Sequence, residues 1–175
     1  MAPLACTHPD RMLVAFLVVA LTGCTLGPGN GNGPAPMNGA PAHVGVASLY
    51  PDPALTPGDT FPGVTQAQVC EPGYSKSVRS VTSDERAEVY RRYGVPNEPG
   101  KHEVDHFISL ELGGSNMLTN LWPEPYEPRP GAHEKDRVEN YLHDQMCNGT
   151  MTLAAAQQAI RSDWYAVYLR IEKQP

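Results

Sequence analysis

Residues 102–126 carry side chains that could hydrolyse a phosphodiester bond. Asp105 and His106 are consecutive, Asn120 follows a pair of glycines, and a second histidine, His133, lies a short distance beyond. A carboxylate binds divalent cations, and an imidazole near its ordinary pKa can take a proton from water at neutral pH. An acid, a base and a second nitrogen ligand in one segment indicate metal-assisted attack on phosphorus.

These residues lie in a segment with the pattern of a β-hairpin. Residues 103–110 alternate in polarity, with His106 on the apolar side and Asp105 on the other, which predicts a strand. Two glycines break this strand, and a second short strand is expected over residues 118–122. Neighbouring side chains of a regular strand point to opposite faces, so Asp105 and His106 would act from different directions. Asn120 follows the turn, where its amide can tie the loop to the strand.

Three helices are expected around the hairpin. The first covers residues 84–93, because Thr82 and Glu85 form a capping-box pair and a glycine follows the last turn. The second covers residues 132–146 and the third residues 153–170, each with apolar side chains on one face. The order helix, hairpin, helix, helix predicts an α+β domain with little sheet.

Three sequence stretches resemble a known nuclease motif. VDHFISLELGGSN, NLWPEP and GAHEKDRVEN are similar to the ββα-metal, or His-Me finger, motif of the HNH nuclease superfamily, in an exported bacterial branch. The resemblance covers most of the chain from Cys70 to Trp164. It implies a small ββα-metal core with flanking helices. It also implies a metal-dependent endonuclease that cuts DNA or RNA outside the cytoplasm.

The resemblance also implies a role for each matching residue. Asp105 matches the first metal ligand, His106 the general base, Asn120 the structural asparagine of the catalytic motif, and His133 the second metal ligand. Asp136, nearly one helical turn after His133, is an additional or rival ligand. One divalent cation is expected, and mixed oxygen and nitrogen ligands accept Mg²⁺, Mn²⁺, Zn²⁺ or Ni²⁺.

The charge of the chain opposes nonspecific binding to nucleic acid. The formal net charge is −6, whereas proteins that bind nucleic acid without sequence specificity are usually basic. Basic residues nevertheless gather before and after the hairpin, and they predict a local cationic rim. Arg129, Lys135 and Arg137 are the expected substrate contacts. The rim as a whole comprises Lys76, Arg79, Arg91, Arg92, Lys101, Arg129, Lys135 and Arg137.

The N-terminal segment has the features of an export signal. Residues 12–22 form one apolar run after Arg11, too short to span a bilayer as a mature helix. The LTGC sequence that follows resembles a bacterial lipobox, which implies a signal peptide over residues 1–23 and lipidation of Cys24. A buried core helix is the alternative, but such a helix should alternate apolar and polar faces. We therefore expect a lipid-anchored protein of the cell envelope, on the periplasmic face or in the outer membrane.

The composition divides the exported chain into a tether and one domain. Glycine and proline dominate residues 24–62, which predicts a disordered tether, and residues 63–175 are expected to fold. Cys70 and Cys147 are the cysteines left in that domain, and an even pair in an exported protein predicts a disulfide. Closing so long a loop should stabilise the fold by roughly 4 to 5 kcal/mol. Two metal thiolates are the alternative, but neither cysteine has a CxxC neighbour.

Two other functions fit the same residues. One is a non-catalytic envelope lipoprotein that uses the HNH-like fold as a binding module; it should tolerate the loss of His106. The other is a metal-dependent hydrolase of a different phosphodiester. The choice of DNA or RNA, the metal and any protein partner stay open at this point.

Overall fold

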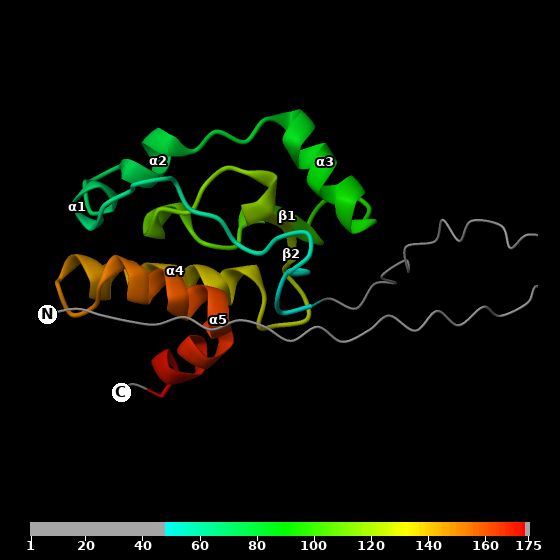
Figure 1. Cartoon of the computed structure of the whole chain (residues 1–175). Helices are drawn as coiled ribbons and strands as arrows, with labels where there is room; N and C mark the ends of the chain where they lie inside the picture. Colours follow the sequence, from blue (N-terminus) through cyan, green and yellow to red (C-terminus); the bar gives the residue numbers. More distant parts are fainter. Residues whose placement is uncertain (1–47, 174–175) are drawn as a thin grey trace, which may run out of the picture. The chain divides into compact units, whose positions relative to one another are not determined.

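The computed structural model describes residues 48–173, which form a mixed fold of helices and one small sheet (Figure 1). The expected signal peptide, the lipidation of Cys24 and the first part of the tether lie outside these residues. Within 48–173, no helix combines the length and apolar character needed to cross a membrane. In chain order the elements are α1 (Gln66–Val69), α2 (Tyr74–Val78), α3 (Ser83–Tyr93), β1 (His102–His106), η1 (Leu110–Leu112), η2 (Leu118–Asn120), β2 (Leu121–Pro125), α4 (Ala132–Cys147) and α5 (Leu153–Ile171).

The hairpin is present but both strands are displaced from their predicted ranges. β1 and β2 pair antiparallel, with His102 opposite Pro125 and His106 opposite Leu121. β1 ends at His106, and the predicted continuation instead turns into the 3-10 helix η1. The cause is Asn120, whose side chain bonds the backbone of Ile108 and so replaces the ladder bonds of a longer strand.

The three predicted helices are confirmed. α3 begins with the expected capping box, in which Thr82 N donates to Glu85 Oε2 at 2.7 Å and Glu85 N donates to Thr82 Oγ1 at 3.2 Å. α4 extends one residue beyond its predicted end. α5 is kinked at Asp163, whose φ of −167° and ψ of 75° interrupt the helical backbone.

The domain begins before residue 63, in contrast to the tether predicted up to residue 62. Residues 48–62 lie against the helices and the hairpin. Trp164 Nε1 donates to Leu49 O at 2.7 Å, Arg92 donates to Leu55 O at 2.9 Å, and the fully buried Thr56 donates to Leu121 O at 2.8 Å. Glycine and proline keep this segment from regular structure, but side chains of the domain satisfy its backbone groups instead.

Two apolar clusters hold the domain together. α4 and α5 lie side by side, and the hairpin lies between α3 and α4 (Figure 1). The smaller cluster joins α3 to the hairpin through Val89, Tyr90, Val104 and Leu121. The larger one joins α4 and α5 to α1 and η1, and it comprises Val69, Ile108, Leu112, Val138, Leu142, Met146, Ala156, Ile160, Trp164 and Val167.

The predicted disulfide between Cys70 and Cys147 is confirmed. It links the C-cap of α1 to the last residue of α4, with a Cα–Cα distance of 5.6 Å and a sequence separation of 77. Its neighbours Val69 and Met146 are both buried in the larger cluster. The crosslink therefore fixes the C-terminal end of α4, while the hairpin packs near the N-terminal end of the same helix.

Candidate active site

His106 is held in one tautomer by a neighbouring amide. Its Nε2 lies 3.0 Å from Asn116 Oδ1. Asn116 Nδ2 donates to Val78 O at 2.8 Å, and its Oδ1 also accepts from Ser80 N at 3.2 Å, so this amide presents its oxygen to the imidazole. Nε2 must then carry the ring hydrogen, which leaves Nδ1 with a free lone pair. Nδ1 is buried and has no hydrogen-bond partner.

The surroundings of His106 favour its neutral form. The side chain is 2% exposed, and this burial lowers its pKa below the ordinary value for histidine. Asp105 and the Asn116 hydrogen bond oppose the shift, whereas the positive charges of Arg79 and Lys135 add to it. A neutral imidazole with an unpartnered nitrogen is a proton acceptor at neutral pH.

Asn120 positions the loop after β1, and the hydrogen bond to the His106 ring comes from Asn116 instead. It is fully buried, its Oδ1 accepts from Ile108 N at 2.9 Å, and its Nδ2 donates to Ile108 O and Ser115 O at 2.9 Å each. Gly114 allows this close approach, because a Cβ there would lie 1.7 Å from Ile108 O. Asn120 therefore fixes the turn that carries Asn116, and through it the orientation of the imidazole.

Lys135 lies at the centre of what we call the acid–lysine cluster, which comprises Lys135, Asp105, Glu124 and Glu139. Its side chain is fully buried, and Nζ lies 2.7 Å from Asp105 Oδ2, 3.4 Å from Glu124 Oε2 and in contact with Glu139. Nζ also donates to His106 O at 2.9 Å. Lys135 was predicted to contact substrate, but the structure encloses its ammonium, which instead joins α4 to β1.

The start of α4 approaches the hairpin closely because residue 131 is a glycine. A Cβ on Gly131 would lie 2.5 Å from Pro125 O, inside contact distance. Gly131 N instead donates to Glu134 Oε2 at 2.8 Å, which completes the first turn of the helix. This close contact between the start of α4 and the hairpin brings Lys135 within hydrogen-bond distance of Asp105 and His106 on β1.

The surroundings favour the charged form of some groups in the acid–lysine cluster and the protonated form of others. Burial alone would lower the pKa of Lys135, but Asp105 and the two glutamates more than offset it and raise that pKa well above its usual range. Burial opposes ionisation of Asp105, yet the adjacent ammonium lowers its pKa overall. Burial raises the pKa of Glu139 to about 7 and that of Glu124 well above its usual range. The ion pair of Lys135 with Asp105 therefore coexists with carboxyl groups that favour protonation.

Glu139 should make the stability of the domain fall as pH rises from 5 to 8. Its raised pKa means that the folded state holds a proton which the unfolded state has released, so its contribution is complete below about pH 4.5 and is lost through about pH 7. Glu139→Gln should reduce this dependence of stability on pH. The free energy of unfolding of the variant should therefore rise relative to that of the native protein as the pH increases. Denaturant unfolding at pH 5, 6, 7 and 8 measures it. Glu71→Gln, at an exposed position, is the control and should leave the slope unchanged; an unchanged slope in Glu139→Gln would contradict the prediction.

Lys135→Met should destabilise the fold by about 3 kcal/mol at neutral pH. The change leaves the half-buried Asp105 carboxylate beside Glu124 and Glu139 with no cation, and only part of this cost is relieved when the glutamates take up protons. The loss should therefore be smaller at pH 5 than at pH 8. Arg137→Met, on the same helix, is the matched control because Arg137 is 50% exposed in its ion pair with Glu172; it should cost under about 1 kcal/mol. Equal losses of stability in the two variants would show that the acid–lysine cluster contributes no more to the free energy of unfolding than an exposed ion pair does.

The predicted metal ligands lie on the solvent side of this cluster. The Asp105 side chain is 18% exposed, and His133 and Asp136 are exposed on α4. Although Asp136 is exposed, neighbouring atoms partly desolvate its carboxyl group; this desolvation, and then the charge of Asp105, raises its pKa, while Lys135, His133 and Arg79 lower it. Asp136 thus lies within electrostatic reach of both predicted partners. The His133 ring packs against Tyr126, with 5.1 Å between the ring centroids.

These ligands do not form a closed site. Across residues 48–173, one group of three histidine, cysteine or acidic side chains has ligand atoms within 4.8 Å of one another, and it comprises Cys70, His143 and Cys147. The ligand atoms of Asp105, His133 and Asp136 therefore do not all lie within this distance of one another. Their chemistry nevertheless fits a divalent cation, because two carboxylates and an imidazole reach solvent on one side of the hairpin–α4 junction. Burial, and then the charge of Asp105, also raises the pKa of Glu103, so a further carboxyl group lies within electrostatic range of Asp105.

The two arginines predicted to bind substrate both have acidic partners. Arg129 contacts Glu134, and Arg137 pairs with Glu172 and lies over the Tyr168 ring at 5.5 Å. Arg79 was not singled out from the rim by its sequence position, but its charge acts on both His106 and Asp136. Asn116 was also missed, although its place just after the paired glycines could have indicated a loop residue that bonds the strand.

Comparison with protein-family models, with curated proteins and with solved structures found no match to this chain. The chemistry of the site is therefore inferred from its own side chains.

Proposed function

We propose that the protein is a metal-dependent endonuclease that hydrolyses phosphodiester bonds of DNA or RNA outside the cytoplasm, with His106 as general base. The observation that carries this proposal is the state of the imidazole. Asn116 binds its Nε2 hydrogen at 3.0 Å, and Nδ1 is left buried without a partner. A buried polar atom without a partner calls for an explanation, and beside a predicted metal ligand a catalytic role for His106 supplies one.

His106 takes a proton from the attacking water through Nδ1. The Asn116 oxygen holds the ring orientation, and its bond to Nε2–H strengthens as the ring becomes positive. The Asp105 carboxylate also favours the protonated ring, since its charge raises the pKa of His106. Both groups stabilise the imidazolium that the reaction forms.

Asp105, His133 and Asp136 are the residues that would hold the divalent cation, and their oxygen and nitrogen donors accept Mg²⁺, Mn²⁺, Zn²⁺ or Ni²⁺. When bound, the cation supplies positive charge that polarises the scissile phosphate and stabilises the leaving oxygen. Lys135 holds one oxygen of Asp105 at 2.7 Å and so fixes the carboxylate. The succession of β1, β2 and α4, with these residues at its junction, supports the ββα-metal assignment.

Arg79 is the side chain we assign to the substrate phosphate. It follows α2, and its positive charge lowers the pKa of both His106 and Asp136. Arg129 and Arg137 remain 66% and 50% exposed beside their acidic partners and extend the cationic rim. Because the net charge is −6, binding of nucleic acid should depend on the cation and weaken with salt.

Action outside the cytoplasm is supported by the disulfide and by the export pattern of the sequence. Disulfides such as Cys70–Cys147 persist in oxidising compartments. The apolar run before Cys24 and the LTGC sequence resemble a lipoprotein signal. We propose that the domain acts at the cell envelope, anchored through a lipid on Cys24.

A non-catalytic binding module is the second candidate, and one observation favours it. Asp105 already has the Lys135 ammonium as a partner, and the predicted ligands do not converge within 4.8 Å. Such a module would bind divalent cations weakly and would keep its function in His106→Ala.

The test is digestion of plasmid DNA and of RNA by the purified full chain. Each of the four cations is added in turn, and a chelator is added in parallel. Cutting that needs a cation and is lost in His106→Ala supports the enzyme. No cutting with any of the four cations favours the binding module, and equal cutting by the two proteins would show that a contaminant is responsible.

A further inference from the structure

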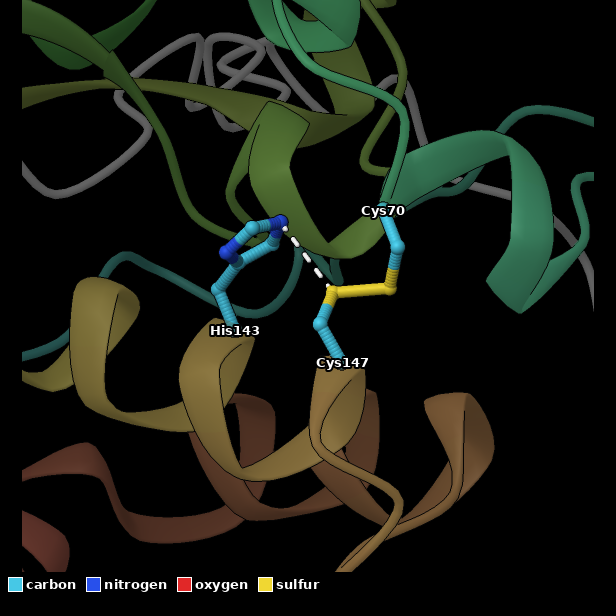
Figure 2. A group of neighbouring side chains, drawn as sticks. All are labelled: Cys70, His143 and Cys147. Carbon is cyan, nitrogen blue, oxygen red and sulfur yellow. Dashed lines mark hydrogen bonds between the residues drawn. A yellow bond between two sulfur atoms is a disulfide. The ribbon is translucent and has the colours of Figure 1, made fainter.

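A second group of metal-binding side chains lies at the opposite end of α4. Cys147 ends this helix, His143 precedes it by one turn, and Cys70 follows α1 (Figure 2). Their ligand atoms all lie within 4.8 Å of one another, and His143 Nε2 is 3.4 Å from Cys147 Sγ. Two sulfurs and an imidazole nitrogen are the donors that zinc and other thiophilic cations prefer.

We propose that reduction of the Cys70–Cys147 disulfide converts this group into a binding site for one thiophilic divalent cation such as Zn²⁺. While the disulfide is intact, its sulfurs are not thiolates and cannot bind the cation. A dithiol reductant supplies two electrons and two protons, becomes a disulfide itself and leaves two thiols. The cation then displaces both thiol protons and is bound by two thiolates and His143.

The backbone already has a spacing suited to such a site. Zinc–sulfur bonds of about 2.3 Å at a tetrahedral angle separate the sulfurs by about 3.8 Å. The Cα atoms of Cys70 and Cys147 are 5.6 Å apart, so rotation of the side chains opens the sulfurs to that distance. Cys147 is exposed and the other two residues are half-buried, which leaves room for water as the fourth ligand.

Two further features bear on the affinity. The carbonyl groups at the end of α4 present the negative end of the helix dipole, which favours a cation beside Cys147. His143 Nε2 also lies 3.2 Å from Val69 O and donates to it in the oxidised protein. Binding through Nε2 moves the ring proton to Nδ1 and gives up this hydrogen bond, so the site should bind zinc less tightly than a preformed one.

This site is separate from the candidate active site. His133 and Cys147 stand at opposite ends of α4, roughly 20 Å apart along the helix axis. A cation bound at Cys147 would also have sulfur ligands, which the group around Asp105 lacks. The two sites can therefore be distinguished by spectroscopy, and either can fail without the other.

The experiment uses the full chain with Cys6→Ser and Cys24→Ser, so that Cys70 and Cys147 are its only cysteines. One portion is reduced with a phosphine, freed of it without air, and titrated with Co²⁺; an oxidised portion is titrated in parallel. Only the reduced protein should bind one Co²⁺ with thiolate charge-transfer absorption, and Zn²⁺ should displace it. His143→Ala should weaken this binding by about tenfold or more. Asn140→Ala, at an exposed position of the same helix, should not.

Far-ultraviolet circular dichroism at each step covers the case in which reduction unfolds the chain. Because binding free energy is then folding free energy, Zn²⁺ should restore the helical signal, and His143→Ala should need more zinc to do so. Absence of thiolate absorption in the reduced protein, failure of zinc to restore a lost helical signal, or equal affinity in His143→Ala would each overturn the proposal.

Discussion

His106→Ala is expected to lower the rate of metal-dependent phosphodiester cleavage by about 10²- to 10⁴-fold, with little change in affinity for the cation. The variant removes the unpartnered Nδ1, which we propose as the proton acceptor, and keeps the residues proposed to hold the cation. Initial rates of plasmid nicking at saturating cation measure the effect. The native protein should also keep its activity below the pH at which an ordinary histidine titrates, because burial lowers the pKa of His106.

Two further variants separate catalysis from folding. His106 is buried, so alanine leaves a cavity, whereas His106→Gln fills most of the space and still lacks a base. Both should be inactive, and the glutamine variant should unfold nearer to the native transition. His102→Ala changes a half-buried histidine at the start of the same strand and should keep most activity. A His106→Gln variant that cuts at the native rate would rule out His106 as the base.

Replacement of both disulfide cysteines, Cys70→Ser with Cys147→Ser, should lower the free energy of unfolding by about 4 to 5 kcal/mol. The bond closes a loop with a sequence separation of 77 residues, and its loss returns that loop entropy to the unfolded chain. Such a loss is comparable with the total stability of many small domains. Denaturant unfolding of both proteins, with circular dichroism as the signal, measures the difference.

Reductant provides the control for this second prediction. It should lower the stability of the native protein towards that of the double variant, and it should leave the double variant unchanged. Zinc should be absent, because we propose that it binds the reduced native protein. A double variant within about 1 kcal/mol of the oxidised protein would mean that the two apolar clusters alone maintain the fold.

Local patterns in the sequence determined the three long helices of this domain. The Thr82–Glu85 pair starts α3 as predicted, and the Thr152 side chain caps α5. The two cysteines predicted to pair do so. The sequence also indicated a turn followed by an amide that ties the loop to the strand, a role in which Asn120 bonds Ile108. The helix caps depend on residues within a few positions of one another, the disulfide on a count of cysteines, and the loop amide on its place after a turn, so each can be predicted from the sequence.

Tertiary packing decided the features that depend on distant residues. The sequence predicts Lys135 to be an exposed cation on a helix. In the structure, three carboxylates from β1, β2 and α4 enclose it. The sequence places Asn116 in a loop without assigning it a role. In the structure, its side-chain oxygen fixes the tautomer of His106. The composition of residues 48–62 predicts a tether. In the structure, these residues are hydrogen-bonded to α3, β2 and α5. In each case the side chain or segment meets partners elsewhere in the chain, and contact with those partners sets its role. For Lys135, the enclosing carboxylates also favour its charged form.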